Sequence, residues 1–191
     1  MLTTSHAILN TTLLGRKDRP ERNWPLVLGA LLPDVPALVY MTFKVAHCAM
    51  NHWVWDNSYY PPIWMPWVDW AHSIPIAAAG VLLALAVKYR PALFFSLSML
   101  LHDIEDLFVH STKSHHQFLP FSDYRFISPV SCHEPEYHAA LMVPLEWMLV
   151  VGCCYFLWKR RPPLWLKGCL VLVCVAQGLG ALYFVLVGQY H

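Results

Sequence analysis

The chain has 191 residues, of which 57% are hydrophobic and only 13% are charged, and its formal net charge is +1. Soluble domains carry about a quarter charged residues, so this composition indicates a membrane protein. A net charge so close to zero excludes a nucleic-acid-binding protein that depends on a basic face. Few residues lie outside the apolar stretches, and we therefore expect residues 1–191 to form a single integral membrane domain.

The apolar stretches predict the elements in chain order. Residues 3–15 have helical apolar spacing but reach only about 20 Å, which is too short to cross a membrane and predicts a half-helix. They lack a basic start and a cleavage site, so we expect this segment to be retained. After a charged turn, the fold is predicted to be an all-α polytopic membrane helix bundle with about five transmembrane helices, at residues 24–43, 73–89, 91–109, 139–158 and 164–187.

The basic residues orient this bundle. When alternate connections are assigned to alternate sides, one side receives ten Lys and Arg: Arg16, Lys17, Arg19, Arg22, Lys88, Arg90, Lys159, Arg160, Arg161 and Lys167. The other side receives Lys44, Lys113 and Arg125. Because cytoplasmic loops carry the excess of positive charge, the side with ten is predicted to be cytoplasmic. The His-rich loop at residues 110–138 then faces outward, where Cys48 and Cys132 could pair if that side is oxidising.

The stretch LSMLLHDIEDLFVH, residues 97–110, is the most informative in the chain. At about 100° per residue, His102, Asp106 and His110 share one side of a helix, Asp103 lies beside them, and Glu105 points away. Charged groups at membrane depth are costly, and they normally face a bundle interior and mark function. The alternative is a helix that simply leaves the membrane here, with its acids as ordinary interfacial charges.

Three further polar residues are predicted to meet this helix. Asp34 lies midway along the first span, where Pro33 and Pro36 should break the helix, and a broken helix is tolerated where it lines a cavity or is buried. His72 opens the second span at the outer face, and His6 lies on the half-helix. We therefore expect these groups to converge with His102 and Asp106 in the outer half of the bundle.

This set of side chains indicates a metal site. Imidazoles and carboxylates together suit a divalent metal, and we expect zinc. A His and an Asp four residues apart supply two ligands from one rigid helix. The expected metal ligands are His6, Asp34, His72, His102, Asp106 and His110. A catalytic zinc keeps one position open for water, and Asp103 or Asp69 is expected to serve as general base or as a ligand to a second metal.

The ordered motifs SHAILN, GALLPD, AHS and LHDIEDLFVH followed by LPFS resemble the bacterial YdjM-type family of predicted inner-membrane metal-dependent hydrolases. The resemblance covers roughly residues 3–122 and implies functional roles for His6, Asp34, His72, His102 and Asp106. It also implies the bacterial inner membrane, in which the outer face expected from the basic residues would be the periplasmic face. The chain has Pro36 and Trp67 where family members often have Asp and His, so a second metal would need a substitute from Asp69, Asp103 or His110.

The sequence thus predicts a membrane-bound metal-dependent hydrolase of an ester or phosphoester. Because the site is expected at membrane depth, the predicted partner is a membrane lipid or a lipid-linked small molecule. Two alternatives remain open: a transporter of metal ions or coupled to protons, and a non-enzymatic membrane protein with a structural metal site. The loop at residues 110–138 is either a set of solvated residues, a second site at its histidines, or a lid at residues 119–129.

Overall fold

The computed structural model describes residues 1–51 and 64–187, with side chains described up to residue 46 in the first of these segments, and within them the chain is all helical. The helices, in order, are α1 (Thr3–Leu14), α2 (Asn23–Leu31), α3 (Val35–Asn51), α4 (Met65–Ala71), α5 (Ile74–Ala86), α6 (Arg90–Leu107), α7 (Ala139–Lys159) and α8 (Leu164–Leu186). Three short 3₁₀ turns accompany them: η1 (Pro20–Arg22), η2 (Leu32–Asp34) and η3 (Pro135–Tyr137). The predicted all-α fold is confirmed in this respect.

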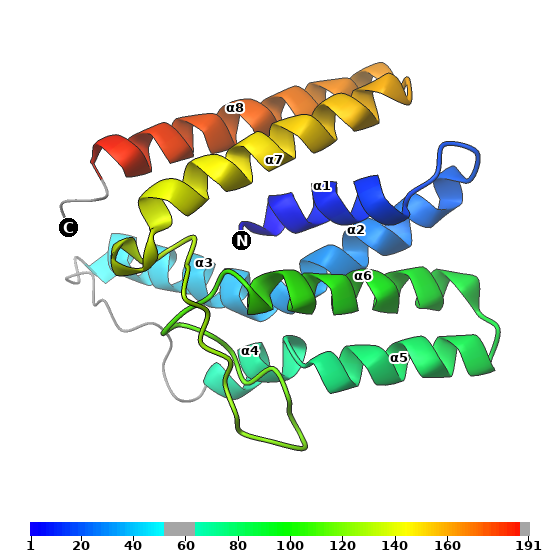
Figure 1. Ribbon diagram of the computed structural model, residues 1–191, viewed down its shortest axis with the longest axis horizontal. Coiled ribbons are helices and arrows are strands. Elements are labelled where there is room, and N and C mark those ends of the chain that lie inside the picture. Colours follow the sequence, from blue (N-terminus) through cyan, green and yellow to red (C-terminus); the bar gives the residue numbers. More distant parts are fainter. Residues whose placement is uncertain (52–63, 188–191) are drawn as a thin grey trace.

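The helices form stacked rows with α1 near the middle (Figure 1). The antiparallel pair α7 and α8 lies on one side of α1, and α2, α6 and α5 follow on the other, with contacts between α1 and each of α2, α6 and α7. The face that α1 buries is polar, since Ser5, His6 and Asn10 are fully buried. A half-helix with such a face is stable only when other helices enclose it.

Hydrogen bonds join this polar face to two neighbouring helices. The Asn10 side chain donates to the carbonyl oxygen of Ser98 at 2.8 Å and to its hydroxyl at 2.9 Å, and that hydroxyl donates to the Leu26 carbonyl at 2.6 Å. Three helices, α1, α6 and α2, are therefore linked at one level. At the same interface a Cβ on Gly29 would overlap the carbonyl oxygen of Phe95, so α2 and α6 approach as closely as a glycine allows.

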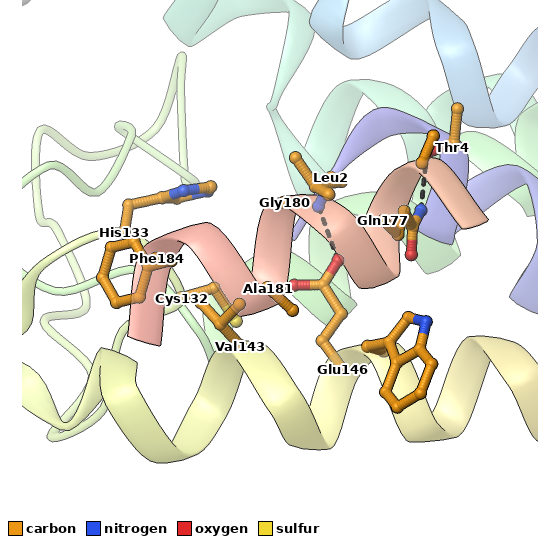
Figure 2. A pocket seen from close by; sticks show the side chains of 12 residues that line it. Leu2, Thr4, Cys132, His133, Val143, Glu146, Gln177, Gly180, Ala181 and Phe184 are labelled. Atoms are coloured by element: carbon orange, nitrogen blue, oxygen red, sulfur yellow. Dashed lines mark hydrogen bonds between the residues drawn. The ribbon is translucent and has the colours of Figure 1, made fainter. Parts of the chain in front are cut away.

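The helix α7 holds α1 at both ends. Near the start of α1, the Glu146 carboxylate accepts the Leu2 N–H at 2.8 Å (Figure 2). The same carboxylate accepts the Ser5 hydroxyl at 2.5 Å. At the far end, the Arg160 guanidinium donates to the carbonyl oxygens of Thr12 and Gly15, both at 2.9 Å. An acid at the N-terminus and a base at the C-terminus of a helix satisfy its unpaired backbone groups and complement its dipole.

The candidate membrane spans are fewer than the five predicted. Among the described residues, three helical stretches are long and apolar enough to cross a membrane: Pro20–Ala46, Ala139–Lys159 and Leu164–Leu186. A fourth is possible if α4 and α5, bent by 45°, count as one span. The helix α5 alone has only 13 residues, and α6 has 18 but carries Arg90, Asp103, Glu105 and Asp106, which lower its hydropathy. The predicted break at Pro33 is a single 3₁₀ turn, η2, within one continuous helical stretch.

Candidate metal centre

The helix α6 supplies the first two groups of the site. His102 and Asp106 are both buried, lie one turn apart on the face of α6 that the sequence predicted, and bring His102 Nε2 to 3.4 Å from Asp106 Oδ2. The helical spacing alone produces this pairing, since residues four apart are neighbours on a helix.

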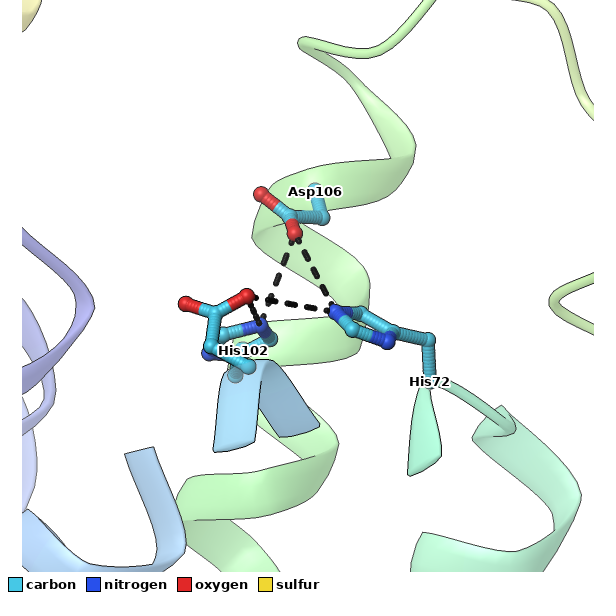
Figure 3. A group of neighbouring side chains, drawn as sticks. His72, His102 and Asp106 are labelled. Atoms are coloured by element: carbon cyan, nitrogen blue, oxygen red, sulfur yellow. Dashed lines mark ion pairs between the residues drawn. The ribbon is translucent and has the colours of Figure 1, made fainter. Parts of the chain in front are cut away.

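Two other elements complete the group. Asp34, the last residue of η2, brings Oδ1 to 3.9 Å from His102 Nε2, and His72, at the C-terminal end of α4, brings Nε2 to 3.5 Å from the same Asp34 oxygen. His72 Nε2 also lies 3.8 Å from Asp106 Oδ2 (Figure 3). One ligand atom from each of these four residues falls within 4.8 Å of all the others, so the predicted convergence of Asp34 and His72 on α6 is found in the structure.

Backbone contacts orient both imidazoles toward the centre of the group. The Nδ1 atom of His72 lies 2.8 Å from the Val68 carbonyl oxygen, and Nδ1 of His102 lies 2.8 Å from the Ala30 carbonyl oxygen. A carbonyl oxygen can only accept, so each Nδ1 donates, and in the neutral imidazole the lone pair is on Nε2. This is the arrangement by which proteins fix the tautomer of metal-binding histidines.

The facing atoms need a positively charged partner. Nε2 of His72 and of His102 is buried and has no hydrogen-bond partner among the described residues, and both atoms face carboxylate oxygens. Lone pairs and carboxylates enclosed together are unfavourable unless a cation lies between them. Zinc bound tetrahedrally to nitrogen and oxygen holds neighbouring ligand atoms roughly 3.3 Å apart. The four separations of 3.4–3.9 Å are slightly wider than this, so Asp34, His72, His102 and Asp106 fit a divalent metal.

His6 and His110, also predicted as ligands, lie at the other oxygen of Asp106. Nε2 of His6 is 3.0 Å from Asp106 Oδ1, Nε2 of His110 is 3.3 Å from it, and the Met1 amino group donates to it at 2.7 Å. The His6 ring also stacks on His102 with centroids 3.7 Å apart. These residues lie outside the four-residue group. They contact Oδ1 of Asp106, the oxygen that does not face the group, and so orient its carboxylate.

The two predicted bases have different surroundings. Asp103 is 2% exposed, and neither of its carboxylate oxygens has a hydrogen-bond partner among the described residues. Asp69, in contrast, has Oδ2 2.6 Å from His116 Nδ1 and accepts the His116 N–H with Oδ1 at 3.1 Å. Asp69 therefore anchors the loop after α6, whereas Asp103 is free to meet a ligand or a proton.

The loop at residues 108–138 covers the end of the site at which α6 ends. His115 stacks on His72 with ring centroids 4.0 Å apart, and the Ser73 hydroxyl donates to the Leu119 carbonyl at 2.5 Å. Burial lowers the pKa of His115 to about 3, so this ring is neutral at physiological pH. Within this loop, the segment predicted as a lid, residues 119–129, contacts the part before it through Arg125, whose Nε donates to His116 Nε2 at 2.9 Å.

Two participants were not predicted from the sequence. Glu105 does point away from the four-residue group, but it meets α1, where Oε2 is 2.6 Å from His6 Nδ1. The Met1 amino group, which contacts Asp106, was also not predicted, because a backbone amino group is not part of any side-chain pattern. Glu105 could have been found, since a His on the half-helix needs a partner when it is buried. For the predicted cysteine pair, Cys132 is a buried free thiol and the side chain of Cys48 lies outside the described residues.

No protein-family model matches the chain, and neither a curated protein nor a solved structure is significantly similar to it. The site therefore has to be interpreted from its own geometry.

Proposed function

We propose that the protein is a membrane-bound, metal-dependent hydrolase of an ester or phosphoester. The observation that supports this most directly concerns the buried Nε2 atoms of His72 and His102, which face the carboxylates of Asp34 and Asp106 and have no hydrogen-bond partner in the part of the chain that the structure describes. A divalent metal, zinc by preference, would be held by these four residues and would supply a nucleophilic water at neutral pH by lowering the pKa of that water.

The residues around the group suggest how each would contribute. Asp34 is the most open of the four, with its side chain 17% exposed against 6% or less for the others, so a substrate would approach from its side. Asp103 would accept the proton lost from the attacking water, because both of its carboxylate oxygens are buried without a hydrogen-bond partner among residues 1–46 and 64–187. His6 and His110, whose Nε2 atoms contact Asp106 Oδ1, would hold this carboxylate in position, and Glu105 would hold His6.

The setting suggests the substrate. Because Asp34 lies within Pro20–Ala46, one of the three helical stretches that are apolar and long enough to cross a membrane, we propose that the substrate is a membrane lipid or a lipid-linked molecule. We further propose the bacterial inner membrane as the location, with the site towards the periplasmic face. This orientation follows from the excess of basic residues in the connections at the opposite end of the bundle.

Elemental analysis of protein purified without chelator tests the metal site. We expect about one divalent metal per chain in the wild type and at least a tenfold loss of metal in Asp34→Ala and His102→Ala, since each substitution removes a ligand. Asp123→Ala, at an exposed loop position, is the matched control and should retain the metal. Wild-type protein without metal above background would contradict the proposal.

One observation favours a second candidate, a non-enzymatic protein with a structural metal site. Four protein side chains are enough to close a tetrahedral zinc site, whereas catalytic zinc has three ligands and a water. Cobalt substitution separates the two. In an open site, added azide would bind and change the visible spectrum of the cobalt protein; in a closed site the spectrum would stay unchanged, and the hydrolase would be ruled out in favour of the structural role.

A further inference from the structure

Three arginines line a small pocket at the end of the bundle that carries the basic connections. This arginine pocket has a volume of about 140 Å³ and lies where the charged turn before α2 meets the start of α6. Arg19 and Arg22 belong to that turn, and Arg90 is the first residue of α6. Because α2 and α6 pack together and begin at the same end of the bundle (Figure 1), arginines from two distant segments are brought to one place.

The three guanidinium groups are not neutralised within the protein. None of them has an ion pair with a carboxylate of residues 1–46 or 64–187. Arg22 is held by an aromatic ring instead, with its Cζ 4.6 Å from the centroid of Phe94. Glu21 is the one acid in the lining, so three positive charges and one negative charge leave a net charge of +2. Such an excess of one sign around a concave surface attracts an anion.

The chemistry of the lining indicates a phosphate. The N–H groups of a guanidinium form a planar fork that matches two oxygens of a phosphate, and hydrogen bonds between ionised groups are the strong ones. The volume of about 140 Å³ is below the range of about 300–1,000 Å³ that is usual for whole small molecules. The arginine pocket therefore suits one phosphate group whose remaining part lies outside it.

The place of the pocket in the bundle indicates where that remaining part lies. The pocket is at the first residues of Pro20–Ala46, a candidate membrane span, which is the level of the lipid head groups. Trp24 and Leu28 are exposed and lie four residues apart on α2, so they form one apolar face that leads away from the pocket. Trp is typical of the membrane interface, and acyl chains would lie along this face.

We infer that the arginine pocket binds the phosphate of an anionic phospholipid. A net negative head group matches the excess positive charge of the lining, and basic pockets between membrane helices bind such head groups. The lipid is here a bound ligand and not a substrate. Arg90 and His102 are twelve residues apart on α6, about 18 Å along the helix, so the pocket and the metal centre are separate sites. The inference does not depend on the proposed hydrolase function.

The charged turn supplies a matched control for this inference. Arg90 lines the pocket, whereas Arg16, in the turn before α2, does not. Both side chains are exposed, so Arg90→Gln and Arg16→Gln make the same chemical change and remove the same charge without opening the interior. A difference between the two variants therefore reports on the pocket and not on the overall charge of this end of the bundle.

Native mass spectrometry of the delipidated full chain in detergent measures the binding. The probes are phosphatidylglycerol and phosphatidylcholine with identical acyl chains. We expect wild-type protein to bind phosphatidylglycerol at least tenfold more tightly than phosphatidylcholine. Arg90→Gln should weaken phosphatidylglycerol binding about tenfold, because hydrogen bonds between ionised groups are lost, whereas Arg16→Gln should change it less than threefold.

Each other result would overturn the inference. Equal affinity of the wild type for the two lipids would do so without any variant. Equal losses in Arg90→Gln and Arg16→Gln would assign the binding to the general positive charge of this end of the bundle. Inorganic phosphate at ten times the lipid concentration should leave phosphatidylglycerol bound, and its displacement would assign the pocket to free phosphate instead of a lipid.

Discussion

At the scale of single residues, the site depends on which nitrogen of each imidazole is committed to the backbone. His72 and His102 each present Nδ1 to a carbonyl oxygen, of Val68 and Ala30 respectively, so Nε2 is left for the centre of the group. The sequence predicted that these residues would meet but not which atoms they would present. That choice depends on the positions of backbone carbonyls in α2 and α4, which no residue pattern encodes.

Asp103 gives a prediction at this scale. Asp103→Asn should leave the metal content unchanged, because Asp103 is outside the four-residue group, but should lower ester turnover by about 100-fold or more, because a proton acceptor is lost. Metal analysis and steady-state turnover on the same preparation provide the measurement. Equal turnover in Asp103→Asn and wild type would remove Asp103 from the mechanism and leave Asp69 as the remaining predicted base.

His6 gives a second prediction, this time for a residue that acts through another. His6→Ala should weaken metal binding about tenfold rather than abolish it, since His6 contacts the Asp106 oxygen that faces away from the group. Competition with a chelator of known affinity measures this loss, and His102→Ala provides the comparison for a direct ligand. A loss in His6→Ala as large as that in His102→Ala would show that His6 is itself a ligand.

At the scale of elements, the sequence predicted helices well and spans less well. The half-helix α1, the polar end of α6 and the apolar pair α7 and α8 were all expected from periodicity and composition, and all are found. The number of spans was overestimated because apolar runs at residues 73–89 and 91–109 were counted as full crossings, whereas α5 is short and α6 is charged in its second half. A helix buried in a bundle and a helix in lipid have similar composition, and only packing distinguishes them.

The close contact of α2 and α6 leads to a prediction for Gly29. Gly29→Ala should lower stability by about 1–3 kcal/mol, since its Cβ would overlap a backbone carbonyl that cannot rotate away. The control is Gly152→Ala in α7, where an added Cβ meets nothing within 4 Å. Thermal unfolding in matched nanodiscs compares them. If Gly29→Ala is as stable as Gly152→Ala, the packing of α2 against α6 does not require a glycine at position 29.

At the scale of the whole molecule, the buried polar groups join its parts. The four-residue group draws one side chain from η2, one from the end of α4 and two from α6, so segments from three regions of the chain meet at one point. Such a group contributes to folding only when a cation offsets the repulsion among its carboxylates. The stability of the bundle is therefore expected to depend on the metal.

Chelation tests this dependence. Metal-loaded protein should unfold about 5–10 °C above the chelator-treated protein, as expected for a ligand present at about 100 times its dissociation constant. The His102→Ala variant is the control and should unfold at the same temperature with or without metal. A wild type whose Tm is unaffected by chelation would show that the group is stable when empty.

The hydrogen bonds of Glu146 and Arg160 to the two ends of α1 have a consequence for biogenesis. Glu146 and Arg160 are translated long after the half-helix that they hold, and α1 is too short to cross a bilayer by itself. Until the C-terminal hairpin has been inserted, Ser5, His6 and Asn10 have only part of their final enclosure. The half-helix α1 thus reaches its final enclosure only after the much later α7 has been made, and the metal centre that His6 supports matures no earlier.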